Sequence, residues 1–228
     1  MKVCVLYSGG KDSNLALLKA SERYEVTCLV TMIPFSVENW LFHYPNVHLT
    51  SFQAEALSLP LISQPCPDNR DVNLLALESA IRVAMETYGV EGVVTGAVKS
   101  MYQMRNFRTV CERLGLTCIN PLWMKNEISL LHEVVESGII AIFTRVAGYP
   151  LNKSLLGKQI DEKIIKLFVS LKSYVNPSGE GGEYETFVLD MPLFKKRIQP
   201  LKWRIEGDDY DASLFIEEAL LIDKTITS

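Results

Sequence analysis

The sequence has little that a membrane-spanning or disulfide-stabilised protein would need. No apolar run reaches the roughly 18 residues of a spanning helix, and the N-terminal stretch MKVCVLYSGG reaches glycine too early for the apolar region of a signal peptide. The five cysteines are odd in number and include no CxxC pair, which disfavours both a disulfide framework and a zinc ribbon. We therefore expect a cytoplasmic protein with no membrane partner.

An excess of basic charge is also absent. The 228 residues contain 23 Lys and Arg residues against 27 Asp and Glu residues, for a net charge of -4, so direct binding to nucleic acid is not expected. Two common phosphate-binding motifs, GxxxxGKS/T and GxGxxG, do not occur. The composition, 48% hydrophobic and 22% charged, is that of an ordinary globular protein with one large domain or two smaller ones.

The first half of the chain alternates short β-rich apolar runs with helical patterns. The predicted strands are KVCVLY, EVTCLVTMI, LPLIS, EGVVTG and LTCIN, and the predicted helices lie near residues 12–22, 50–58, 72–88 and 101–114. Such alternation predicts a parallel sheet with helices on both faces. Right-handed crossovers make this a doubly wound α/β domain, with its ligand site beyond the carboxyl ends of the strands.

This rhythm changes after NPLW at residues 120–123. A helix near 126–137, the strand GIIAIFTRV, a helix near 161–172 and strands near 185–190 and 197–206 follow, with a solvated acidic turn at 206–211. We expect a nucleotide-binding domain over residues 1–122 and a smaller α+β domain over residues 123–228, which would bind substrate.

A glycine-containing turn, SGGKDS at residues 8–13, links the first predicted strand to the first predicted helix; we call it the phosphate loop. Glycines at this point let backbone amides and the positive end of the helix dipole approach an anion. The string and its place after strand one resemble the PP-loop ATP pyrophosphatases, an adenine-nucleotide α-hydrolase family with a HUP-like fold. A plain glycine turn with an Asp/Ser cap is the alternative.

The PP-loop resemblance implies a set of nucleotide contacts. In that family the loop holds the β- and γ-phosphates of ATP while a substrate oxygen attacks the α-phosphate, giving an adenylate and pyrophosphate. Lys11 would add positive charge and Asp12 would hold Mg²⁺, which offsets the charge of the leaving pyrophosphate. Gly96 and Ala97, at the end of a later strand, would let the nucleotide approach the backbone, although a plain strand-end turn is equally compatible. The implied nucleotide-binding residues are Ser8, Gly9, Gly10, Lys11, Asp12, Ser13, Gly96 and Ala97.

A second glycine-rich stretch, SGEGGEYE at residues 178–185, concentrates glutamates that repel one another unless a cation lies among them; we call it the acidic loop. The string GEGGEYET resembles the diphthine–ammonia ligase family. Further family-like stretches are FHYPN at 42–46, YQ at 102–103, CERLGL at 111–116, NPLW at 120–123 and DMPLF at 190–194. Asn106 and Arg108 depart from the family pattern, which has Arg and Glu two positions apart.

This second resemblance implies an ATP-dependent amide ligase. Diphthine on elongation factor 2 would be activated as an acyl-adenylate and converted to diphthamide by ammonium, with release of AMP and pyrophosphate. Position 2 is Lys2 and no Cys/His pair is evident, so free ammonium is the expected nitrogen source.

The same resemblance assigns roles around the acidic loop. Diphthine carries a permanent cation beside its carboxylate, so carboxylates and an aromatic face suit it. Glu183 and Glu185 are the expected catalytic partners of Lys11 and Asp12, and Glu183→Gln is expected to lower turnover with the acceptor. A tight loop with glutamates facing water is the alternative. The implied substrate-binding residues are His43, Asn46, Tyr102, Gln103, Glu180, Gly181, Gly182, Glu183, Tyr184 and Glu185, and His43 and Asn46 fit a simple turn equally well.

Two other functions fit the phosphate loop. A PP-loop tRNA thiolase or ligase shares the adenylation step, but such enzymes commonly carry catalytic cysteine pairs or a basic domain. A non-catalytic nucleotide-binding module shares the fold, but it has no need for the complete set of Lys11, Asp12 and Ser13.

Overall fold

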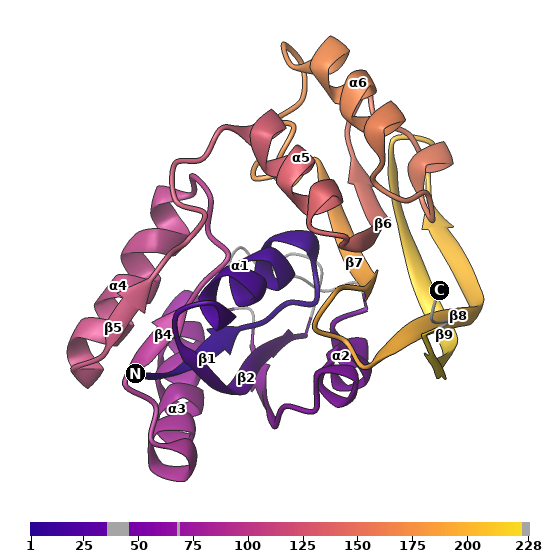
Figure 1. Ribbon diagram of the computed structural model, residues 1–228. Helices are drawn as coiled ribbons and strands as arrows, with labels where there is room; N and C mark the ends of the chain where they lie inside the picture. Colours follow the sequence, from indigo (N-terminus) through magenta and orange to yellow (C-terminus); the bar gives the residue numbers. More distant parts are fainter. Residues whose placement is uncertain (36–45, 68, 225–228) are drawn as a thin grey trace.

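A five-stranded parallel sheet forms the first half of the protein in the computed structural model, which describes residues 1–35, 46–67 and 69–224. Its strands are β1 (Lys2–Leu6), β2 (Glu25–Pro34), β3 (Leu61–Cys66), β4 (Gly92–Val94) and β5 (Thr117–Ile119), in the order β3-β2-β1-β4-β5 (Figure 1). The order reverses direction between β1 and β4, as in a doubly wound sheet. The predicted α/β fold is confirmed.

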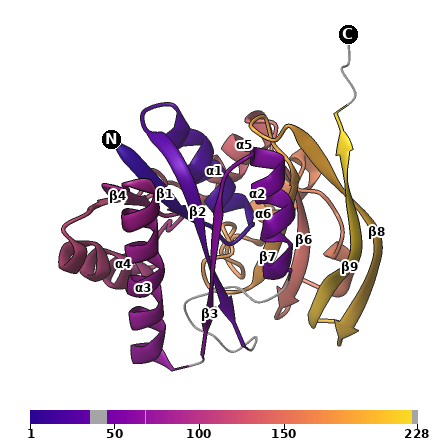
Figure 2. The same cartoon turned by 90° about the horizontal axis from the view of Figure 1, so that it is seen from below.

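Helices cover both faces of this sheet. They are α1 (Lys11–Ser21), α2 (Thr50–Leu57), α3 (Arg70–Tyr88) and α4 (Met101–Leu114), with a short 3₁₀ helix η1 (Val47–Leu49) before α2. Figure 2 shows α3 and α4 on one side of the sheet and α1 on the other. Apolar side chains of α3 and α4, such as Leu77, Ile81 and Val110, pack in one cluster with strand residues such as Val93.

Local signals explain where α4 begins and ends. The Ser100 side chain accepts a hydrogen bond from Gln103 N, and Gly115 ends the helix in the left-handed region at φ 68°, the usual residue for that backbone conformation. The helix runs unbroken through Asn106, which is buried, and Arg108, which is exposed. These two departures from the family pattern therefore leave the helix intact.

A four-stranded antiparallel sheet forms the second half. It contains β6 (Ile140–Ala147), β7 (Tyr184–Asp190), β8 (Lys196–Gly207) and β9 (Asp211–Asp223), in the order β7-β6-β9-β8. The helices here are α5 (Glu127–Glu136), α6 (Glu162–Leu171) and the 3₁₀ helix η2 (Lys153–Leu155). The acidic segment at 206–211 spans the turn between β8 and β9. Strand β9 is an addition to the predicted elements.

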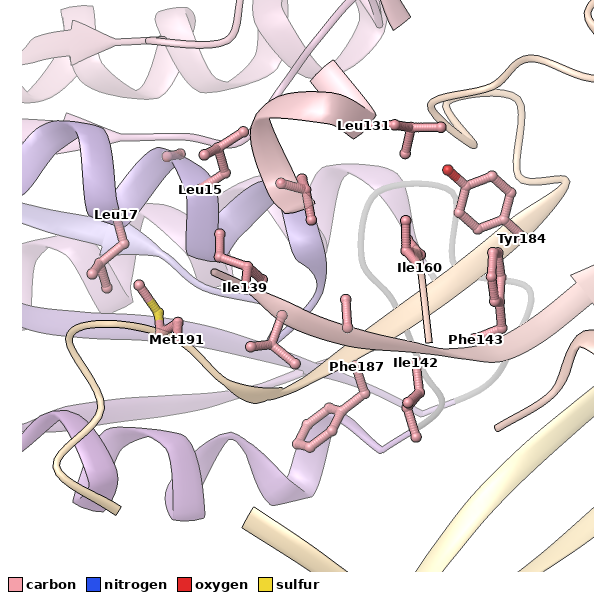
Figure 3. Packing of buried hydrophobic residues seen from close by; sticks show 14 of the residues in the cluster. Leu15, Leu17, Leu131, Ile139, Ile142, Phe143, Ile160, Tyr184, Phe187 and Met191 are labelled. Carbon is pink, nitrogen blue, oxygen red and sulfur yellow. The ribbon is translucent and has the colours of Figure 1, made fainter. Parts of the chain in front are cut away.

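One hydrophobic core joins the two halves. Leu15 and Leu17 of α1 belong to the same buried cluster as Ile139, Phe143 and Phe187 of the second half (Figure 3). Helix α1 thus lies between the parallel sheet and strands β6 and β7. This packing fixes the phosphate loop, at the start of α1, against the second sheet.

Asn46 ties η1 to β9. Its Nδ2 donates to Leu214 O at 2.8 Å, its Oδ1 accepts from Ile216 N at 2.7 Å, and the residue is buried in the left-handed region at φ 61°. Separately, within the described ranges no helix has the length and apolar character that a bilayer crossing requires.

Candidate functional site

A cavity of about 570 Å³ opens at the carboxyl ends of β1 and β4, which is the point where the strand order reverses and where doubly wound sheets bind ligands. Its volume is within the usual range for small-molecule sites. Both the phosphate loop and the acidic loop line it, together with the start of α4 and part of β6 and β7. Two segments about 170 positions apart in sequence therefore form one site.

The phosphate loop is shaped by close packing at its glycines. Gly9 has φ +82°, and a Cβ atom there would lie 2.6 Å from Gln53 Oε1. A Cβ atom on Gly96, two residues after β4, would lie 2.9 Å from both Asp12 C and Ser13 N, so only glycine lets this segment approach the start of α1 so closely. Gly10 is the N-cap of α1 and provides no side-chain cap. The N-terminus of the helix faces the cavity and is therefore suited to bind an anion.

Lys11 is buried beneath the acidic loop. Its Nζ donates to Asp12 Oδ2 at 2.8 Å and to Ser178 O at 2.6 Å, and it lies 5.1 Å from the centre of the Tyr184 ring. Burial is the largest single influence on the Lys11 ammonium and lowers its pKa, but the charge and hydrogen bond of Asp12, together with Tyr184 and Glu180, outweigh burial and the net shift is upward. Lys11 is therefore a permanent cation at the base of the phosphate loop.

Asp12 has one oxygen to spare. Its Oδ2 pairs with Lys11, whereas its Oδ1 is buried without a hydrogen-bond partner among the described residues. No cluster of three or more metal-ligating side chains occurs in the described ranges. A Mg²⁺ ion at a nucleotide site typically takes one or two carboxylates and completes its shell with phosphates and water, so a single carboxylate oxygen fits that ion.

Strand β7 holds the phosphate loop from the other side. Thr186 Oγ1 accepts from Lys11 N at 3.0 Å, and Val188 N donates to Gly9 O at 2.9 Å. Gln53 of α2 donates from Nε2 to both Gly9 O and Val188 O, at 3.0 and 2.7 Å. Sequence reasoning missed Thr186 and Gln53, although Thr186 is the last residue of the GEGGEYET string and was available as a signal.

Glu180 occupies the backbone amides that precede α4. Its Oε1 accepts from Val98 N at 3.0 Å, and its Oε2 accepts from Lys99 N at 3.2 Å and from Ser100 N at 2.7 Å. The predicted substrate contact is thus engaged, in this structure, in fastening the acidic loop to the first half. Three amide donors at a helix start explain this position, since a carboxylate is well stabilised there.

Glu183 is turned into the acidic loop itself. Its Oε1 accepts from Asn176 N at 3.1 Å, its Oε2 is buried without a partner among the described residues, and it is not one of the residues that line the cavity. Its neighbour Tyr184 does line the cavity and donates its hydroxyl to Pro177 O at 2.6 Å. Burial raises the pKa of that hydroxyl, so the Tyr184 ring stays neutral beside Lys11.

The antiparallel sheet supplies the remaining charged wall. Glu185 of β7 and Arg145 of β6 both line the cavity, and both are half-buried. Arg145 donates to Ser213 Oγ at 3.1 Å and pairs with Asp211 Oδ1 at 2.9 Å. Sequence reasoning missed Arg145, because an isolated arginine in a strand gives no motif.

The other predicted site residues divide into three groups. Ser8, Gly10, Ser13, Gly96, Ala97, Tyr102, Gln103, Gly181 and Gly182 line the cavity. Gly9 and Asn46 do not line it: the carbonyl of Gly9 accepts from Gln53 and Val188, and the side-chain amide of Asn46 bonds to β9. His43 lies outside the described residues.

Comparison with known proteins gives two family matches that together cover most of the chain. The family model described as the diphthamide synthase N-terminal domain matches residues 1–118, and the diphthamide synthase C-terminal domain matches residues 126–222. The gap between them lies where the parallel sheet ends and α5 begins.

Several curated relatives carry the name diphthine–ammonia ligase. The Schizosaccharomyces pombe protein is 37% identical over 216 residues, which cover 87% of this chain and 36% of that protein. The human protein is 33% identical over 219 residues, which cover 87% of this chain and 82% of that protein. The chain therefore spans about a third of the fission-yeast relative and most of the human one.

Two solved structures share parts of the architecture at low sequence identity. One is described as a predicted subunit of tRNA methyltransferase from Methanocaldococcus jannaschii, with TM-score 0.47 and 16% identity, covering 84% of this chain and 98% of that one. The other is a 4-thiouridine synthetase in complex with RNA and bound ATP, with TM-score 0.44 and 18% identity, covering 59% of this chain and 40% of that one.

Proposed function

Because the chain belongs to the diphthamide synthase family, whose named relatives are diphthine–ammonia ligases, we propose that it is an ATP-dependent carboxylate–ammonia ligase. It converts diphthine on elongation factor 2 to diphthamide with ammonium, through an acyl-adenylate, and releases AMP and pyrophosphate. The observation that carries this proposal is a single cavity lined by both the SGGKDS loop and the GEGGEYET loop.

The two halves of the chain divide the work in this proposal. Residues 1–122 bind the nucleotide and residues 123–228 bind the acceptor, with the cavity between them. The phosphates of ATP meet the N-terminus of α1 and the charge of Lys11. Thr186 and Val188 of β7 keep the phosphate loop in that conformation, so the second half also orders the nucleotide site.

Asp12 is the residue that would hold Mg²⁺, through the unpartnered Oδ1. The bound ion would offset the negative charge that develops on the departing pyrophosphate. Lys11 cannot substitute for this role alone, because its ammonium is already shared between Asp12 and Ser178 O.

The chemistry needs activation because hydroxide is a poor leaving group from a carboxylate. A carboxylate oxygen of diphthine attacks the α-phosphorus of ATP, and the bond to the β-phosphate oxygen breaks. Ammonia then attacks the acyl carbon and AMP leaves. The chain's own residues orient these groups: the phosphate loop positions ATP, the buried Tyr184 and Lys11 exclude water beneath the acidic loop, and Glu185 presents a negative charge on the acceptor side.

Glu183 has a supporting role in this proposal. Its bond to Asn176 N holds the acidic loop against the segment that precedes it, and its place outside the cavity wall separates it from the reacting groups. This changes the catalytic role expected from the sequence into a positioning role.

Release of AMP and pyrophosphate from purified protein tests the proposal. We expect both products only when ATP, ammonium and diphthine-bearing elongation factor 2 are present together, in amounts equal to the diphthamide formed. Elongation factor 2 with an unmodified histidine is the matched acceptor control. Product formation with tRNA in place of the factor would support the tRNA-modifying alternative, and nucleotide binding without any turnover would support the non-catalytic alternative.

A further inference from the structure

We propose that Arg145 binds the carboxylate of the acceptor and that Arg145 and Glu185 together recognise diphthine as a zwitterion. This inference rests on the proposed function and adds a specificity-determining residue to it. Diphthine carries a trimethylammonium group beside its carboxylate, so a complementary site needs one cation and one anion side by side. The cavity wall formed by β6 and β7 supplies one of each.

A bulge in β6 brings these two side chains together. Phe143 pairs with Thr186 and Arg145 pairs with Glu185, so Thr144 is an extra residue with no partner on β7. Directly opposed residues on antiparallel strands have side chains on the same face. Without the bulge, Arg145 would share the face of Phe143, which packs against Phe168 and Tyr184.

The bulge is unfavourable for folding in one respect. Thr144 is fully buried, and its Oγ1 has no hydrogen-bond partner among the described residues. A buried hydroxyl without a partner destabilises a protein, because its hydrogen bonds to water are lost on folding and not replaced. A bulge beside a cavity that carries this penalty points to a functional reason for aiming Arg145 at Glu185.

The other charged groups of the cavity wall are already engaged by the protein. Lys11 and Asp12 bond to each other, and Glu180 accepts from three backbone amides. Glu185 does have further contacts within the protein, but it lies directly across from Arg145 in the β6–β7 ladder. Among the described residues that line the cavity, Arg145 is thus the cation on the wall that we assign to the acceptor.

Arg145 retains the capacity to bind a carboxylate. Among the described residues it donates to Ser213 Oγ and Asp211 Oδ1, whereas a guanidinium has five N–H donors. The Asp211 side chain is 67% exposed, and an ion pair with so exposed a partner contributes little to stability. A guanidinium fork fits a carboxylate in a bidentate way, which a lysine cannot reproduce.

Steady-state kinetics of Arg145→Gln in the full chain test this proposal. We expect the KM for diphthine-bearing elongation factor 2 to rise roughly 10- to 100-fold, the range set by loss of a hydrogen bond to a charged group. The KM for ATP should stay within about twofold, because the hydrogen bond and ion pair of Arg145 among the described residues go to Ser213 and Asp211 of β9 and not to the phosphate loop. Arg145→Lys keeps the charge but loses the fork, so a smaller rise of severalfold is expected.

Two further variants separate recognition from structure. Arg204→Gln removes an arginine of the same sheet that pairs with Glu217 and does not line the cavity, and its acceptor KM should match that of the wild type. Asp211→Asn breaks the ion pair between β6 and β9 but leaves the guanidinium. If Asp211→Asn reproduces the loss, Arg145 acts only by fastening β9 and the proposal is overturned.

The remaining outcomes are equally decisive. An unchanged acceptor KM in Arg145→Gln, or a rise in the KM for ATP instead, overturns the role of Arg145 while leaving the ligase activity in place. If Arg145→Gln fails to fold, as judged by thermal unfolding, Arg145→Lys decides, and an unchanged acceptor KM in that variant overturns the proposal. Absence of any turnover by the wild-type protein overturns both the proposed function and this inference.

Discussion

The phosphate loop and the acidic loop both use glycine for close packing and for positive φ values, but the hydrogen-bonding groups that they provide are opposite. Gly9 has φ +82°, and a Cβ atom there would lie 2.6 Å from the Gln53 side chain; beside the phosphate loop, a Cβ atom on Gly96 would lie 2.9 Å from the backbone of Asp12 and Ser13. In the acidic loop, Gly179 and Gly182 adopt positive φ values of 76° and 82°, which bend the chain so that its glutamates point in different directions.

The phosphate loop provides backbone N–H donors at the start of α1, whereas the acidic loop provides carboxylate and carbonyl acceptors. Glu180 accepts from the amides before α4, Glu183 accepts from the amide of Asn176 just before the acidic loop, and Ser178 O accepts from the Lys11 ammonium. Of the three glutamates, Glu180 and Glu185 line the cavity, and Glu185 belongs to the wall that we propose for the acceptor. The acidic loop thus serves in large part to connect the two halves of the protein. The following substitutions test this difference between the phosphate loop and the acidic loop.

Asp12→Ala should have the largest effect. Loss of the oxygen proposed to hold Mg²⁺ should lower turnover by roughly 100-fold or more, since charge stabilisation by a metal is worth several kcal/mol in the transition state. Quenched-flow measurement of pyrophosphate release checks this result. Asp209→Ala, which removes an exposed carboxylate of the β8–β9 turn, is the control, and wild-type release by Asp12→Ala would contradict the PP-loop assignment.

The sequence predicted the phosphate loop more fully than the acidic loop. SGGKDS lies between a strand and a helix whose patterns are local, so its conformation follows from neighbouring residues. The contacts of Thr186, Arg145 and Glu180 depend instead on which strands pair and on a bulge at Thr144, and neither is written in a local pattern. A glutamate that accepts hydrogen bonds from backbone amides cannot be told, from sequence alone, from a glutamate that contacts a ligand.

Strand β9 was missed for a related reason. Its segment DASLFIEEALLID contains Glu, Ala and Leu residues that favour helices, and no period-2 alternation runs through it. Pairing with β8 along most of its length and with β6 at Arg145–Ala147 determines its conformation. Tertiary context overrides a weak local preference of this kind.

Gly96→Ala should have the second largest effect. A Cβ atom 2.9 Å from the backbone of Asp12 and Ser13 must displace the start of α1, and overpacking of this kind costs about 1–3 kcal/mol. We expect the KM for ATP to rise roughly tenfold with little change in the acceptor KM. Gly92→Ala, at the start of the preceding strand β4 and with its nearest contact at 3.2 Å from Thr117 O, should lower stability without altering the KM for ATP.

Glu180→Ala tests whether the acidic loop connects the two halves of the protein. Three backbone amides lose their acceptor, so the free energy of unfolding should fall by about 1–3 kcal/mol, which corresponds to a lowering of Tm by several degrees for a chain of this size. Denaturant unfolding checks the value. Unchanged stability with a selective rise in the acceptor KM would show that Glu180 contacts the acceptor during turnover. It would also contradict a role for Glu180 in connecting the two halves.

Glu183→Gln should have the smallest effect, although its position in the motif once favoured a direct role. Gln keeps an Oε1 acceptor for Asn176 N, and the oxygen it replaces, Oε2, has no partner among the described residues. We expect turnover within about threefold of the wild type. Glu185→Gln, two residues further on, is the matched comparison: it removes the same charge from the cavity wall and should raise the acceptor KM at an unchanged KM for ATP. The reverse pattern, a strong loss in Glu183→Gln and none in Glu185→Gln, with both variants as stable as the wild type, would mean that the acidic loop rearranges when the acceptor binds, because Glu183 does not line the cavity while it is bonded to Asn176.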